Sequence, residues 1–166
     1  MMDSMLKKID EDKLRKVAGA FATGIAVASV MDEAEELIGM TVNSFLSVSL
    51  DPPILLFSAG KESRLLKHCE PGKKLSLNIL SADQKNLSDY FAGLPVEINK
   101  SAFEREAEFI RFPGAMAWYK TTVREAIDTG DHQLILLDII DCKRNENSEP
   151  LIFYKGYRTI GHTIKE

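Results

Sequence analysis

The chain has 166 residues, of which 45% are hydrophobic and 28% are charged, and its formal net charge is −4 at pH 7. This composition is typical of one soluble domain, and the acidic balance argues against a nucleic-acid partner, which usually needs clustered basic residues. No apolar run reaches the about 18 residues of a membrane-spanning helix, so no membrane is expected. Cys69 and Cys142 are too far apart for a metal-binding spacing, and we interpret them as free thiols in a reducing cytoplasm.

The first predicted element is a helix over residues 11–22, with Asp10 as its N-cap. Its apolar residues recur at i, i+3, i+4 and i+7, which predicts a stripe that faces the core. The stripe consists of Leu14, Val17, Ala18 and Phe21. Gly24 is expected to end the helical segment.

Three strands follow in the predicted order. Residues 25–31 and 37–45 form a hairpin across the acidic connection 32–36. Because proline cannot donate to a sheet ladder, Asp51-Pro52-Pro53 breaks the chain before a buried strand over residues 54–58.

The middle of the chain mixes short helices with one strand. Ser63 is predicted to cap a short helix through His68, residues 74–80 alternate as a strand, and Ser81 or Asp83 caps a helix through Phe91. The stretch 93–114 reads as a long excursion with about one helical turn, and such loops are often functional or poorly ordered.

Three late strands, at residues 117–127, 132–143 and 151–159, are predicted to form an antiparallel meander, with a turn at 129–131. Many strands with few short helices favour a mainly β fold, a β-barrel with peripheral helices. Glycine-rich phosphate-binding motifs are absent, so a dinucleotide would not be held by a Rossmann turn.

The most informative run is Gly39-Met40-Thr41-Val42-Asn43-Ser44-Phe45-Leu46-Ser47-Val48-Ser49-Leu50-Asp51-Pro52-Pro53. A strand would place Ser44 among apolar residues and Phe45 among polar ones, so neither face would be uniformly apolar or uniformly polar. A buried polar group without a partner costs about 1–3 kcal/mol. Two explanations are open: these side chains satisfy turns or neighbouring strands, or they line a small-molecule cleft.

This run resembles the flavin-binding segment of the flavin reductase-like family, the reductase components of two-component flavin monooxygenases. Three further stretches resemble that family in order, at residues 21–27, 130–132 and 150–157, and the resemblance covers about residues 11–160 of a single domain, 1–166. It implies a split β-barrel that forms homodimers and binds flavin in a groove near the subunit interface.

The resemblance also implies which residues contact the flavin. An isoalloxazine needs short polar side chains around an apolar slot, which this motif supplies. The segment 58–64 follows a strand and opens a short helix, and helix N-termini and cations suit a phosphate. From chemistry alone, a solvated loop with a helix cap is the stronger interpretation of this segment, and the resemblance favours the phosphate. The ring candidates are Thr41, Val42, Asn43 and Ser44; the phosphate candidates are Ser58, Lys61, Ser63 and Arg64; Asn78 and Tyr157 are weaker candidates.

His132, within Gly130-Asp131-His132, matches the motif that the family associates with the nicotinamide nucleotide. The implied activity is hydride transfer from NADH or NADPH to FMN or FAD, with His132 as the catalytic candidate and a monooxygenase as a possible recipient of reduced flavin. A flavin-binding protein or electron carrier without turnover is the alternative. The chain departs from the family pattern between Ala92 and Pro113, which leaves the nucleotide preference open.

Overall fold

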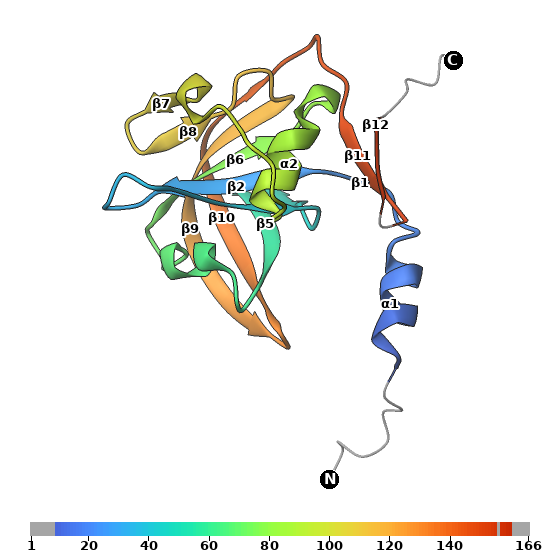
Figure 1. Ribbon diagram of the computed structural model, residues 1–166. Coiled ribbons are helices and arrows are strands. Elements are labelled where there is room, and N and C mark those ends of the chain that lie inside the picture. The colour runs from blue at the N-terminus through green and yellow to red at the C-terminus, as the bar shows by residue number, and fades with distance from the viewer. Residues whose placement is uncertain (1–8, 156, 161–166) are drawn as a thin grey trace.

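Seven antiparallel strands form the main sheet of the computed structural model, which describes residues 9–155 and 157–160 (Figure 1). The sheet is open, because its two edge strands, β3 and β4, do not pair with each other. The prediction of a mainly β fold with peripheral helices is confirmed, although the barrel is not closed by hydrogen bonds. In spatial order the strands are β3 (Leu37–Val42), β2 (Ala26–Met31), β6 (Lys74–Ile79), β9 (Ala117–Thr129), β10 (His132–Arg144), β5 (Pro53–Gly60) and β4 (Leu46–Leu50).

A small second sheet corrects the predicted meander. β9 and β10 pair as expected, but the segment predicted as one strand over 151–159 is a hairpin of β11 (Leu151–Tyr154) and β12 (Tyr157–Ile160). This hairpin pairs with β1 (Thr23–Gly24) and not with β10. Lys155 has a φ of 51°, in the left-handed region, and so reverses the chain at the point where a continuous strand was expected.

The first helix, α1 (Glu11–Ala18), begins as predicted and is stabilised at its N-terminus by the Asp10 carboxylate, which accepts a hydrogen bond from the Lys13 amide at 2.8 Å. It ends four residues earlier than predicted. The predicted core-facing stripe is wrong: Val17 is 66% exposed and Phe21 is 79% exposed, and no residue of α1 is buried. Figure 1 shows α1 set apart from the main sheet.

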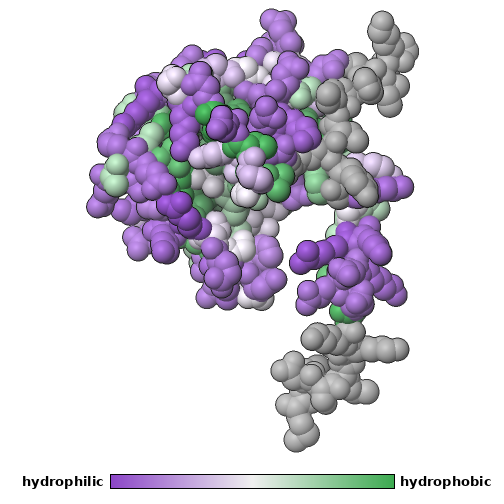
Figure 2. Space-filling model, viewed as in Figure 1, coloured by the Kyte–Doolittle hydropathy of each residue, from purple (hydrophilic) through white to green (hydrophobic). Residues whose placement is uncertain are grey.

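Two hydrophobic clusters lie on opposite faces of β2. Ala26 and Ala28 face the first cluster, while Val27 faces the second, as expected for the period-two alternation of a strand. The second cluster lies under α2 (Lys85–Phe91), in the area where Figure 2 shows hydrophobic residues gathered on a mostly hydrophilic face. Gly39 lets α2 approach β3 closely, because a Cβ there would lie 2.6 Å from the Phe91 ring.

The short helices follow the sequence closely. Ser63 caps η1 (Arg64–His68), with its hydroxyl accepting a hydrogen bond from the Leu65 amide at 3.3 Å. Ser81 precedes η2 (Ala82–Gln84), which continues into α2. Within the described ranges, 9–155 and 157–160, no helix is long and apolar enough to cross a membrane.

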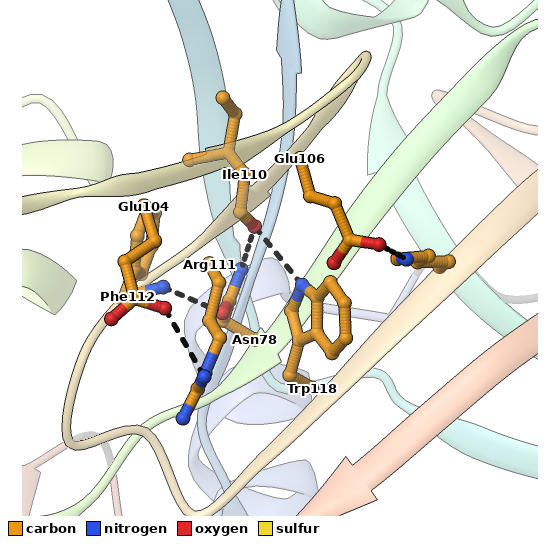
Figure 3. Close-up of polar contacts among 8 residues, drawn as sticks. Asn78, Glu104, Glu106, Ile110, Arg111, Phe112 and Trp118 are labelled. Carbon is orange, nitrogen blue, oxygen red and sulfur yellow. Dashed lines mark hydrogen bonds and ion pairs between the residues drawn. The ribbon is translucent and has the colours of Figure 1, made fainter.

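The excursion over residues 93–114 contains the predicted helical turn, η3 (Lys100–Ala102), and also a hairpin that the sequence did not reveal, β7 (Glu104–Glu106) with β8 (Phe109–Arg111). The hairpin is fixed to the main sheet through backbone groups of β8 and the residue after it (Figure 3). Asn78 donates to the Ile110 carbonyl at 3.0 Å and accepts from the Phe112 amide at 3.0 Å. The Trp118 indole also donates to the Ile110 carbonyl, at 3.2 Å.

Candidate functional site

The adjoining ends of β5 and β10 bring together residues that are far apart in the sequence. His132 is the register partner of Gly60, the last residue of β5. The backbone amide of Lys61 donates to the Asp131 carbonyl at 3.0 Å, and the amide of Ser63 donates to the Gly60 carbonyl at 2.9 Å. The fold therefore places the nicotinamide candidate beside the phosphate candidates.

His132 is held at one side of its ring. Its Nδ1 lies 2.7 Å from Oδ1 of Asp131, and its side chain is 47% exposed. The hydrogen bond with His132 is the main reason why the pKa of Asp131 lies below its usual value, so this carboxylate remains ionised at neutral pH. A carboxylate at Nδ1 favours this orientation of the ring and leaves Nε2 for another partner.

Ser44 and Ser58 form a reciprocal pair. The Ser58 amide donates to the Ser44 hydroxyl at 2.9 Å, and that hydroxyl donates to the Ser58 carbonyl at 3.2 Å. Because Leu46 pairs with Leu56, Ser44 stands where the next ladder pair of β4 and β5 would be. Its side chain thus continues the ladder and ties the end of β3 to β5.

The side chains of Thr41 and Val42 also make contacts within the fold. The Thr41 hydroxyl donates to the Ser88 carbonyl of α2 at 2.7 Å, and Val42 is 4% exposed in the core. The hydrogen bonds of Thr41 and Ser44 therefore agree with the first explanation, in which these side chains bond to other segments of the fold. β3 is nevertheless an edge strand, so alternate backbone N–H and C=O groups on its outer side remain available to a ligand.

Asn43 lines a cavity of about 180 Å³ together with the Phe21–Ala26 stretch, Phe45 and Ile79. Thr23 also lines this cavity, although its hydroxyl is itself buried and has no hydrogen-bond partner among the described residues. Asn43 gives this mostly apolar cavity a side-chain amide, so the cavity suits a ligand with a polar edge. The sequence reasoning did not single out Thr23, although it lies in one of the stretches that resembles the family.

Both cations among the phosphate candidates pair with carboxylates. Arg64 lies 3.3 Å from Glu36, with 69% of its side chain exposed, and Lys61 lies 3.4 Å from Asp128. Arg64 and residues of β3 line a cavity of about 200 Å³. Exposed ion pairs contribute little free energy, so either cation can exchange its carboxylate for a phosphate.

The two weaker candidates for flavin contact are Asn78 and Tyr157. Asn78 is 0% exposed and both its polar atoms bind the backbone beside β8, so a flavin contact would require it to give up these bonds, and its place in the flavin pocket stays a prediction. Tyr157 belongs to β12, but its side chain lies outside the described residues. In the part of the chain that the structure describes, no three His, Cys, Asp or Glu side chains gather as a metal site.

Comparisons with known proteins place the chain in a family. Residues 18–161 match the family model described as a flavin reductase like domain. The chain is 35% identical over 149 residues to the NADH-dependent flavin reductase StyB of Pseudomonas fluorescens, covering 88% of this chain and 87% of the relative. It is also 40% identical over 131 residues to a probable flavin reductase of Rhizobium meliloti, of whose longer chain it spans 42%.

A solved structure extends the match to the fold. The styrene monooxygenase flavin reductase from Pseudomonas putida S12 superposes with a TM-score of 0.81 at 31% sequence identity, covering 92% of this chain and 99% of that one. The sequence resemblance is thereby confirmed, and the chain belongs to the flavin reductase-like family.

Proposed function

We propose that this chain is an NADH-dependent flavin reductase that uses FMN or FAD as its acceptor. The observation that carries the proposal is the match over nearly the full length of an NADH-dependent relative, with 87% of that relative covered. The geometry supports it, because His132 and the phosphate candidates Lys61 and Ser63 meet at one end of the main sheet.

The residues present suit a flavin. We assign the ring to the cavity just beyond the end of β3, where Asn43 offers a polar contact beside an apolar wall that includes Phe45 and Ile79. We assign the phosphate to Ser63, Lys61 and Arg64. A bound flavin supplies the redox chemistry by accepting a hydride from reduced nicotinamide.

The protein's part in this reaction is to bind and orient. The Asp131 carboxylate holds the His132 ring, whose free side is positioned to contact the carboxamide of a nicotinamide. Ser44 and Thr41 fix the backbone of the β3 edge against β5 and α2, so that its outward-facing groups keep their positions. Rigid support of this kind is what a hydride transfer requires, since small misplacements slow it strongly.

We also propose a homodimer in the cytoplasm that passes reduced flavin to an oxygenase. The homodimer is supported by apolar side chains that the single chain leaves exposed. They are Ile9, Leu14, Val17 and Phe21 at the N-terminus, and Leu46, Val48 and Leu50 on the edge strand β4. The oxygenase is supported by the relative named as the flavin reductase of a styrene monooxygenase.

The proposed function is tested by steady-state oxidation of NADH and NADPH, with FMN, FAD and riboflavin as separate acceptors. We expect turnover with NADH that depends on added flavin. If flavin binds but neither nucleotide is oxidised, the reductase proposal fails and the alternative, a flavin carrier, takes its place. If no flavin binds at all, both proposals fail.

A further inference from the structure

A cavity of about 350 Å³ lies between the turn that joins β2 to β3 and the 93–114 excursion. Its apolar wall includes Leu37, Phe103 and Ile110, and its charged rim includes Glu35, Lys100 and Arg105. A volume of this size falls in the range of small-molecule sites, which combine an apolar lining with a few polar groups.

This cavity adjoins the proposed phosphate site. Glu36 and Leu37 line both it and the smaller cavity that contains Arg64. Glu36 is also the carboxylate that pairs with Arg64, at 3.3 Å. A dinucleotide whose phosphate meets Arg64 therefore has a second compartment within reach on the other side of Glu36.

Arg105 is fixed at the rim of the larger cavity. Its Nε donates to the Ala107 carbonyl at 2.9 Å, and its Nη2 donates to Glu35 Oε1 at 3.3 Å, while Nη1 pairs with the other oxygen of the same carboxylate. The hydrogen bond from Arg105 lowers the pKa of Glu35, so the carboxylate is charged at neutral pH. Arg105 and Glu35 lie together at one side of the cavity, and their opposite charges largely cancel.

Lys100 differs from the other charged groups of the rim. Its Nζ lies 5.3 Å from the centroid of the Tyr90 ring, and it forms no ion pair within the described ranges, 9–155 and 157–160. The Tyr90 ring also lines the smaller cavity. Lys100 thus offers a positive charge without a carboxylate partner next to both compartments, which suits an anionic ligand.

We propose that the larger cavity binds the adenylate end of a dinucleotide, with Lys100 contacting its phosphate. This inference rests on the proposed function, which supplies FAD and NADH as the two sources of an adenylate. The apolar wall of Leu37 and Phe103 suits the face of a purine, and the Glu36 carboxylate can accept hydrogen bonds from ribose hydroxyls, as acidic residues do in other nucleotide sites.

The test uses the full chain and calorimetric titration with AMP, FMN, FAD and riboflavin. Lys100→Glu reverses the charge of an exposed residue, and Lys73→Glu is the matched control, since Lys73 is exposed and lines neither cavity. We expect AMP to bind the parent and the control, and to bind Lys100→Glu about fivefold or more weakly, the effect of losing about 1 kcal/mol of ion-pair energy. FMN and riboflavin affinities should not change.

The source of the adenylate follows from two further readouts. If Lys100→Glu weakens FAD but not FMN, the adenylate belongs to the flavin; if it raises the KM for NADH and leaves FAD unchanged, the adenylate belongs to the nicotinamide nucleotide. Equal AMP affinity in Lys100→Glu and the parent, or no AMP binding to the parent, overturns the inference. The AMP titration needs no turnover, so it remains decisive even if flavin reduction is absent and the proposed function fails.

Discussion

Arg64 has a carboxylate partner in this structure and a phosphate in the proposed complex. The exposed pair with Glu36 contributes little, so the arginine is free to change partners. We expect Arg64→Ala to weaken FMN by about fivefold or more and to leave riboflavin, which has no phosphate, nearly unchanged. Fluorescence titration of both flavins measures this, and equal weakening of the two would contradict the phosphate role.

The two cysteines should differ in reactivity. Burial raises the pKa of Cys69 to about 12, and its thiol donates to the Leu65 carbonyl at 3.3 Å, whereas Cys142 is exposed. Since the thiolate is the reactive form, we expect iodoacetamide at pH 8 to modify Cys142 in the folded protein, and both cysteines after unfolding. Mass spectrometry counts the adducts, and rapid modification of Cys69 in the folded chain would contradict its burial.

The same pKa shift gives a pH dependence with a defined sign. The folded value of about 12 lies above the 9.0 of a free thiol, so the folded state retains the proton of Cys69 longer than the unfolded chain does. The resulting stabilisation is complete below pH 9 and is lost as the pH rises toward 12. Urea unfolding at several alkaline pH values, with Cys69→Ala as the comparison, measures this contribution.

Individual polar residues show where sequence reasoning ends. Thr41, Ser44 and Asn78 were all predicted to contact flavin. In the structure they form hydrogen bonds with backbone groups that lie 47, 14 and 32 residues away in the chain, respectively. Such partners are fixed by sheet register and helix packing, which no local pattern reveals. The Ser63 cap was predictable because its partner, Leu65, is two residues away.

At the scale of elements, Asn78 is one of three buried side chains, with Ser76 and Trp118, that tie the β7–β8 hairpin to the main sheet. Asn78→Ala removes the hydrogen bonds to the Ile110 carbonyl and the Phe112 amide, and we expect a loss of about 2–4 kcal/mol in the free energy of unfolding. Chemical denaturation measures it, with Asn86→Ala on the exposed side of α2 as the control. A stable variant that instead loses flavin affinity would support the place of Asn78 in the binding site.

Elements with strong local signals were predicted well and weak ones were not. The acidic turn 32–36 forms as expected, because the Asp32 carboxylate accepts from the Ala34 and Glu36 amides. The strands of the β7–β8 hairpin have three residues each, too few for a visible alternation. The stripe of α1 carried the right helical period, but periodicity cannot tell whether the apolar face meets the chain's own core or another molecule.

At the scale of the whole molecule, the exposed apolar face of α1 predicts assembly. We expect a dimer by sedimentation at micromolar concentration, and we expect Val17→Glu, at a residue that is 66% exposed, to shift the equilibrium toward the monomer. Lys16→Glu changes the charge of the same helix without touching the apolar face. A parent protein of monomeric mass would rule out the proposed assembly.

The central claim is that flavin is reduced by NADH beside His132, where β5 and β10 end together. The most direct measurement is the anaerobic single-turnover rate of flavin bleaching by NADH, compared between the parent and His132→Ala, with dithionite as a reductant that needs no nucleotide site. We predict that the variant binds flavin normally and reacts with NADH about 10–100-fold more slowly, while dithionite reduces both proteins equally. Equal NADH rates in the two proteins would contradict this role for His132, and an absence of NADH-dependent bleaching in the parent would contradict the function itself.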